Sequence, residues 1–167
     1  MKCVNTNNFQ TPIWCCKYMR SLIPKGVNTV LEPTAGEGNL VNILKDNYEV
    51  ISPKDFWKLK VTEKFDCIVM NPPFTPMSLG YKILYQCMNM SDNIITLMPW
   101  LVLINSEKRT KDIFSYGLKS VTHLPRNTFP GARVQTCVLQ MKRLYKNDTI
   151  FRYIQTKEKC RTIENWL

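Results

Sequence analysis

The tetrapeptide Asn71-Pro72-Pro73-Phe74 places the strongest constraint on how this chain can fold. It follows an apolar run at residues 65–70, which predicts a buried strand. Proline has no N–H to donate to a sheet, so two consecutive prolines must end the strand. The Asn71 side chain, two backbone carbonyls and the Phe74 ring are then expected at its carboxyl end. Two acceptors beside an aromatic face suit a planar group that carries an NH2.

A second motif lies upstream, in residues 30–40. The pattern predicts a strand that ends at Glu32, a turn with Gly36 and Gly38, and a helix that begins near Asn39. The two glycines permit a tight turn and a close approach to a ligand. The dinucleotide-binding pattern G-x-G-x-x-G is incomplete, because position 41 is valine. A carboxylate at Glu32 would repel a pyrophosphate but attract the ammonium of an amino-acid-like ligand.

The rest of the chain alternates predicted strands with predicted helices. Thr11 is expected to cap the first helix, with Pro12 at its first position. The alternation predicts a doubly wound α/β sheet, in which ligands bind beyond the carboxyl ends of the strands. The two motifs should therefore share one cleft. Strands are expected at residues 29–31, 48–51, 65–70, 93–98, 120–124, 134–141 and 149–154, and helices at 11–22, 39–45, 78–90 and 106–116.

Taken together, the motifs resemble those of class I S-adenosylmethionine-dependent methyltransferases, specifically the DNA adenine-N6 type with the gamma order of motifs. Glu-Pro-x-x-Gly-x-Gly at residues 32–38 precedes Asn-Pro-Pro-Phe at 71–74. Residues 9–12 are similar to the family's Phe-x-Thr-Pro element, and Asp55-Phe56 is similar to the pair that contacts the adenine of the cofactor. Residues 124–131 resemble the late loop whose aromatic residue packs on the target base, and residues 134–141 its last core strand.

The resemblance implies a Rossmann-like methyltransferase sheet, mostly parallel with an antiparallel last strand, and compacted. It implies one domain over residues 1–167, with a core at about 9–142 and a C-terminal extension at 143–167. There is no room for a separate target-recognition domain, so recognition would come from short loops or from a protein partner.

The resemblance also assigns the site residues. The catalytic set is Asn71, Pro72, Pro73 and Phe74, and Phe74 and Phe129 would stack on the target base. The cofactor would be S-adenosylmethionine, bound by Phe9, Thr11, Pro12, Glu32, Pro33, Thr34, Gly36, Gly38, Asp55 and Phe56.

The implied reaction is methyl transfer to the exocyclic N6 amine of adenine in double-stranded DNA, as in the DNA methylation of restriction-modification systems. The target base would be flipped out of the duplex, because it cannot reach the cleft from inside it. The acceptor pair at Asn71 and Pro72 suits any planar NH2, so adenine in RNA, cytosine N4 and a protein glutamine remain alternatives. A catalytically weak cofactor-binding subunit that needs a partner for DNA recognition is another.

One departure from the family pattern concerns the cofactor ribose. The family has a strand and a helix, with a ribose-binding acid, between the glycine loop and the Asp-Phe pair. Here sixteen residues separate Gly38 from Asp55, and they hold one predicted helix and one predicted strand. Glu49 is the candidate acid in this segment. Loss of the ribose carboxylate predicts a reduced cofactor affinity.

The composition favours a polyanionic partner, because 23 basic and 13 acidic residues give a net charge of +10. Basic residues cluster at 108–111, 142–146 and 157–161. Seven cysteines without a C-x-x-C pair, and the single histidine His123, disfavour zinc and disulfides, so no metal is expected. No apolar run reaches transmembrane length and no secretory signal is present, which predicts a cytoplasmic protein without membrane contact, of plausible bacterial or phage origin.

Overall fold

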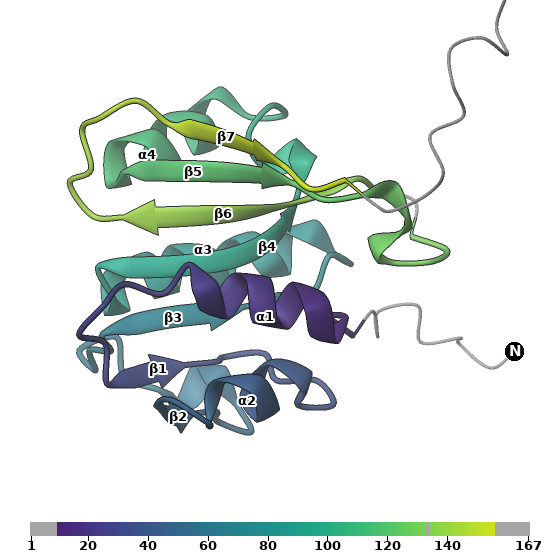
Figure 1. Ribbon diagram of the computed structural model, residues 1–167. Helices are drawn as coiled ribbons and strands as arrows, with labels where there is room; N and C mark the ends of the chain where they lie inside the picture. Colours follow the sequence, from purple (N-terminus) through teal and green to yellow (C-terminus); the bar gives the residue numbers. More distant parts are fainter. Residues whose placement is uncertain (1–9, 133, 156–167) are drawn as a thin grey trace, which may run out of the picture.

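A computed structural model describes residues 10–132 and 134–155, and Figure 1 shows its sheet with helices on both faces. The α-helices are α1 (Ile13–Ser21), α2 (Asn39–Leu44), α3 (Met77–Met90) and α4 (Glu107–Tyr116). The strands are β1 (Thr29–Leu31), β2 (Glu49–Ile51), β3 (Cys67–Met70), β4 (Asn93–Pro99), β5 (Leu118–His123), β6 (Thr136–Lys142) and β7 (Ile150–Tyr153). Three short 3-10 helices are η1 (Phe56–Lys58), η2 (Trp100–Val102) and η3 (Arg126–Thr128). The expected strands and helices are confirmed, with bounds shifted by a few residues.

The seven strands form one sheet in the order β2-β1-β3-β4-β6-β5-β7. The chain leaves β1 through α2 toward one edge of the sheet, and it leaves β3 through α3 toward the other. The order therefore reverses between β1 and β3, which are parallel neighbours. Crevices at such a reversal are where ligands bind in open α/β sheets.

The sheet is mostly parallel, as expected. Strand β6 lies antiparallel to both of its neighbours, β4 and β5. It is the strand that the family resemblance predicted as the last core strand. β7 adds to the far edge of β5 in parallel orientation. The predicted doubly wound, Rossmann-like fold is thus confirmed.

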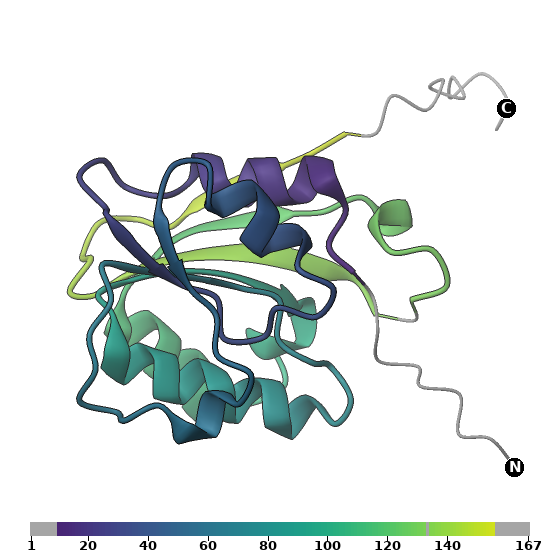
Figure 2. The ribbon, with the colours of Figure 1, turned by 90° about the horizontal axis from the view of Figure 1, so that it is seen from below.

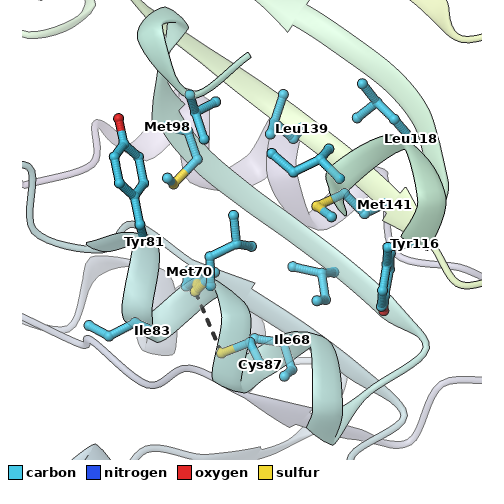
Figure 3. Packing of buried hydrophobic residues seen from close by; sticks show 14 of the residues in the cluster. Ile68, Met70, Tyr81, Ile83, Cys87, Met98, Tyr116, Leu118, Leu139 and Met141 are labelled. Carbon is cyan, nitrogen blue, oxygen red and sulfur yellow. Dashed lines mark hydrogen bonds between the residues drawn. The ribbon is translucent and has the colours of Figure 1, made fainter. Parts of the chain in front are cut away.

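Helices cover both faces of the sheet (Figure 2), and an apolar layer lies between the sheet and the helices on each face. Successive residues of β3 point to opposite faces. Cys67 and Val69 pack toward α1 and α2, whereas Ile68 and Met70 pack toward α3 and α4. Figure 3 shows the second layer, where the Cys87 thiol of α3 lies 3.8 Å from the Met70 sulfur. All four β3 side chains are buried, which explains the uninterrupted apolar run in the sequence.

The start of α1 differs from the prediction. Pro12, not Thr11, is the N-cap residue, and its carbonyl accepts the first helical hydrogen bond from the Cys16 N–H at 2.9 Å. Proline supplies no capping side chain, so the helix begins without one. The Thr11 hydroxyl is instead engaged outside the helix, by Asn71.

Candidate active site

A cavity of about 600 Å³ opens at the carboxyl edge of the sheet, at the reversal between β1 and β3. Four separate segments line it: the residues before α1, the loop between β1 and α2, the turn between β3 and α3, and the loop between η3 and β6. The lining residues are Gln10, Thr11, Thr34, Ala35, Gly36, Asn39, Leu40, Asn71, Pro72, Pro73, Phe74, Thr75, Met77, Phe129, Gly131, Ala132, Val134 and Thr136. The two sequence motifs therefore meet in one cleft, as their positions at strand ends predicted.

The segment before α1 folds across the glycine loop. The side chain of Gln10 accepts a hydrogen bond from the Glu37 N–H at 3.1 Å. A Cβ at Gly36 would lie 2.8 Å from the Gln10 side-chain nitrogen, and Gly36 has a φ of +55°. The positive φ favours glycine here, because a side chain would be strained in this conformation. A Cβ would also require the flexible end of Gln10 to shift.

Thr11 joins this segment to the other two sides of the cavity. Its backbone carbonyl accepts a hydrogen bond from the Asn39 Nδ2 at 3.0 Å, at the start of α2. Its hydroxyl oxygen accepts one from the Asn71 Nδ2, also at 3.0 Å. The second bond engages the nitrogen of the Asn71 amide, so it sets the rotation of the amide and directs Oδ1 away from Thr11.

Helix α3 packs closely against the turn that follows β3. Pro72 is buried, and both prolines line the cavity. A Cβ at Gly80 in α3 would lie 2.5 Å from the Pro73 carbonyl oxygen. Only glycine lets the helix approach this backbone so closely. Gly80 was not singled out in the sequence, because its requirement depends on a contact with another segment.

Two phenylalanines from distant parts of the chain line the same cavity. Phe74 follows the two prolines, and Phe129 follows η3. Both pack against the apolar layer on the α1 side, and Phe129 is only 5% exposed. The structure thus brings together the two rings predicted to stack on a target base.

Glu32 lies beneath the glycine loop and is completely buried. Its Oε1 accepts hydrogen bonds from the N–H and the hydroxyl of Thr34, each at 3.0 Å. Its Oε2 has no hydrogen-bond partner among the described residues. Burial raises the pKa of Glu32 from 4.5 to about 7, against the two Thr34 hydrogen bonds, which lower it. Glu32 does not line the cavity, but it orients Thr34, which does.

The remaining predicted cofactor residues are placed as follows. Pro12, Pro33 and Gly38 flank cavity residues without lining the cavity, and Phe9 lies outside the described residues. Asp55 does not line the cavity either; it caps η1 by accepting the Trp57 N–H at 3.1 Å. Phe56 is buried in the apolar layer on the α3 side. Cofactor contacts by these residues stay predictions.

Glu49 lies at the edge of the sheet opposite the cavity. Glu49 begins β2 and pairs with Thr29, the first residue of β1. Its side chain is therefore exposed at the amino edge of the sheet, whereas the cavity lies at the carboxyl edge. β2 ends at Ile51 and is followed by Ser52, whose hydroxyl donates to the Glu32 carbonyl at 3.0 Å. This position disfavours Glu49 as the ribose acid, and its role stays a prediction to be tested.

Several lining residues were missed in the sequence. Gln10 and Asn39 lie inside the recognised motifs, so their polar side chains were the available signal. Met77, Ala132, Val134 and Thr136 carry none, because apolar and small residues at these places look like ordinary parts of a helix or strand.

The basic clusters are partly engaged within the protein. Lys108 forms an ion pair of 2.6 Å with Asp112, and the Arg109 guanidinium lies 3.7 Å from the ring centre of Tyr81. Arg143 forms an ion pair of 2.6 Å with Asp92. Residues 157–161 lie outside the described part of the chain. Lys108 and Arg143 are therefore partly neutralised by acidic neighbours.

The described residues contain no group of three or more His, Cys, Asp or Glu side chains that could hold a metal ion. In the same residues, no helix is long and apolar enough to cross a bilayer. The five described cysteines are free thiols and are buried, and burial raises the pKa of Cys67 and Cys137 to about 12.

No protein-family model and no curated protein matches the sequence. Solved structures do match. A protein assigned to the class I S-adenosylmethionine-dependent methyltransferases, from Listeria monocytogenes, aligns with 93% of this chain and 68% of its own, at a TM-score of 0.72 and 13% identity. A modification subunit assigned to a type I restriction enzyme of Vibrio vulnificus aligns with 93% of this chain and 49% of its own, at a TM-score of 0.72 and 13% identity.

A third structure is the methyltransferase subunit of a type I restriction-modification system from Streptococcus thermophilus. It aligns with 88% of this chain and 47% of its own, at a TM-score of 0.69 and 17% identity. The chain thus has the fold of class I methyltransferases. It spans about half the length of the two restriction-modification subunits.

Proposed function

We propose that this chain transfers the methyl group of S-adenosylmethionine to the N6 amine of an adenine in DNA. The observation that carries the proposal is the Asn71 amide, held by Thr11 in a cavity that the glycine loop and two phenylalanines also line. The class I methyltransferase fold supports the choice of cofactor.

The residues present fit the cofactor's charge. S-adenosylmethionine, when bound, supplies a methyl group on a sulfonium, next to an ammonium and a carboxylate. The cavity is lined by the loop that Glu32 orients, and this buried carboxyl keeps one oxygen without a described partner. Ionised Glu32 would favour a cation above the loop and so would help to hold the amino-acid end.

The acceptors act on the substrate amine. The lone pair of an adenine amine is delocalised into the ring, which makes it a poor nucleophile. Asn71 Oδ1 and the Pro72 carbonyl would each accept one N–H, which favours a pyramidal nitrogen whose lone pair points at the methyl carbon. The nitrogen–carbon bond forms as the carbon–sulfur bond breaks, and the amine then loses a proton to water. Rate would come mainly from position and electrostatics.

DNA is favoured by the charge and by the two rings. The net charge of +10 suits a polyanion. Phe74 and Phe129 line the same cavity and would stack on a purine ring, and a duplex base must be flipped out to reach them. Adenine in RNA, cytosine N4 and a protein glutamine carry the same planar NH2, so the test must compare all of these.

A second candidate is a cofactor-binding subunit with weak catalysis, which relies on a partner for DNA recognition. One observation favours it. Strand β2 is followed by Ser52 and Pro53, so no acid stands at this strand end to bind a ribose.

The deciding experiment is transfer of a tritiated methyl group to DNA, RNA and protein, with the methylated product identified by mass spectrometry. We expect N6-methyladenine in DNA from the wild-type chain. Asn71→Ala should keep cofactor binding but lose at least tenfold in turnover, about 1.4 kcal/mol of transition-state stabilisation. Asn147→Ala, an exposed asparagine in the loop before β7, is the matched control.

The outcomes separate the candidates. The second candidate would be supported if the chain binds the cofactor but transfers no methyl group alone, and if a cognate DNA-recognition protein enables the transfer. Absence of cofactor binding at millimolar concentration would refute both.

A further inference from the structure

A second recess, of about 600 Å³, adjoins the cavity at the carboxyl edge of the sheet. Phe129, Gly131 and Ala132 line both, so the two hollows flank the same loop between η3 and β6. Most of the other lining residues come from η3, from the end of β5 and from the end of β7. The proposed methyl transfer uses no residue of η3, β5 or β7.

One wall of the recess is aromatic. His123 ends β5 and Tyr153 ends β7; the two are register partners, and their ring centres are 5.5 Å apart. Two more rings extend this pair into a row of four. The ring centre of Trp100 lies 5.8 Å from that of His123, and the ring centre of Phe151 lies 6.0 Å from that of Trp100. Tyr153 is 60% exposed and Phe151 is 63% exposed, so both ends of the row face solvent.

The row is held in place by a hydrogen bond. The Trp100 Nε1–H donates to the His123 Nδ1 at 3.0 Å. Indole nitrogen can only donate, so Nδ1 is the acceptor and neutral His123 carries its proton on Nε2. The hydrogen bond therefore fixes the orientation of the His123 ring, which has one N–H donor, at Nε2.

The other wall of the recess is polar and cationic. Arg126 and Asn127 of η3 are exposed and line it, together with Gln135. None of the described lining residues is acidic. An exposed aromatic surface beside a guanidinium matches one ligand class in particular, a nucleotide with its flat base and its phosphate.

We propose that this recess binds a nucleotide adjoining the target nucleotide, with the base stacked on Tyr153 and the phosphate at Arg126. The proposal rests on the proposed function in that nucleic acid is the substrate. The position of the recess beside the cavity supports it, because a strand whose target base lies against Phe129 can pass its next nucleotide along the same loop. Stacking accepts any base, so the contact would hold the strand without reading its sequence.

The test measures binding and needs no methyl transfer. The full chain is titrated, by fluorescence anisotropy, with a single-stranded thymine oligonucleotide of about eleven nucleotides that has one central adenine. A second oligonucleotide has abasic sites on both sides of the adenine. We expect Tyr153→Leu to weaken binding of the intact strand about tenfold, and to leave binding of the abasic strand unchanged, because base stacking is lost only where a base exists.

Three further variants sharpen the test. Tyr153→Phe keeps the ring and should bind as the wild type does. Arg126→Gln should reduce the slope of log affinity against log salt by about 0.7, the value for one phosphate contact with a single strand. Phe114→Leu, half exposed on α4, and Lys25→Gln, exposed in the loop between α1 and β1, are the matched controls and should change neither quantity.

The proposal is overturned if Tyr153→Leu affects both strands equally, if it affects neither, or if the wild-type chain binds no oligonucleotide. A change in oligomeric state in Tyr153→Leu with unchanged oligonucleotide affinity would also overturn it, and would assign the β7 edge to a protein partner. Cofactor binding, measured separately by calorimetry, reports on the proposed function and does not depend on Tyr153.

Discussion

The Asn71 side-chain amide donates a hydrogen bond of 3.0 Å to the Thr11 hydroxyl, although the two residues are sixty positions apart in the sequence. Thr11 also accepts from Asn39 through its backbone carbonyl. The short segment before α1 therefore connects the β3 turn to the glycine loop, and the rotation of the Asn71 amide depends on it.

Replacement of Thr11 by valine tests this dependence. Thr11→Val keeps the shape of the side chain but removes the acceptor, so the Asn71 amide loses its orientation. Turnover should fall about threefold to tenfold, the equivalent of one hydrogen bond of about 1 kcal/mol. Single-turnover methyl transfer at saturating cofactor measures it. Thr11→Ser keeps the hydroxyl and should retain most of the rate; equal rates for serine and valine would contradict the positioning role.

Gly80→Ala should impair the site from behind. Alanine normally stabilises a helix by about 0.8–1 kcal/mol relative to glycine. Here the new Cβ would meet the Pro73 carbonyl oxygen at 2.5 Å, so the helix or the β3 turn must move. A misplaced acceptor turn should lower turnover by about tenfold to a hundredfold. Ser78→Ala, at an exposed position of the same helix, is the control. Unchanged turnover in Gly80→Ala would show that the turn tolerates the shift.

Glu32 should make stability depend on pH in an unusual direction. Its pKa is raised from 4.5 to about 7 in the folded protein, so between these values the folded state keeps a proton that the unfolded state has lost. Stability therefore falls as pH rises through this interval, by up to about 3 kcal/mol, and changes no further above it. Denaturant unfolding of the wild type and of Glu32→Gln, at pH values between about 4 and 8, gives the free energy of unfolding of each protein as a function of pH. The variant should lack this decline; parallel profiles would mean that Glu32 ionises normally.

Glu49→Gln should leave cofactor affinity unchanged, because Glu49 lies at the amino edge of the sheet, away from the cavity. The absence of an acid at the end of β2 predicts that affinity is modest, roughly 10- to 100-fold below that of a site with a ribose carboxylate. Isothermal titration with S-adenosylmethionine and its demethylated product measures both quantities. A clear loss in Glu49→Gln would require a different placement of the ribose.

Much of the sheet was predictable because its strands end abruptly. Prolines after Met70 and Met98 mark the carboxyl ends of β3 and β4, and apolar runs mark buried strands. The position of the cavity followed from this, since parallel strand ends share one edge. The first turn of α1 was mispredicted, because Thr11 has the side chain of a capping residue but is engaged by Asn71 across the cleft.

What could not be predicted depends on contacts between distant segments. The need for glycine at position 80 arises from the backbone of Pro73, seven residues earlier in the sequence and in another element. The aromatic row is likewise spread over three segments, at Trp100, His123 and residues 151–153. The pairing of β7 with β5 brings these rings together, and no local pattern in the sequence announces it.

The antiparallel direction of β6 has a consequence for how such a protein can diversify. Because β5 ends and β6 begins at the same edge, residues 124–135 form an excursion that leaves the sheet and returns to the same place. Such a segment can lengthen, shorten or be exchanged without a change in strand register. Phe129 and Arg126 both lie on it, beside a scaffold that holds Asn71 and the glycine loop independently. Changes in this segment can thus alter the residues that face a ligand, while Asn71 and the glycine loop stay in place.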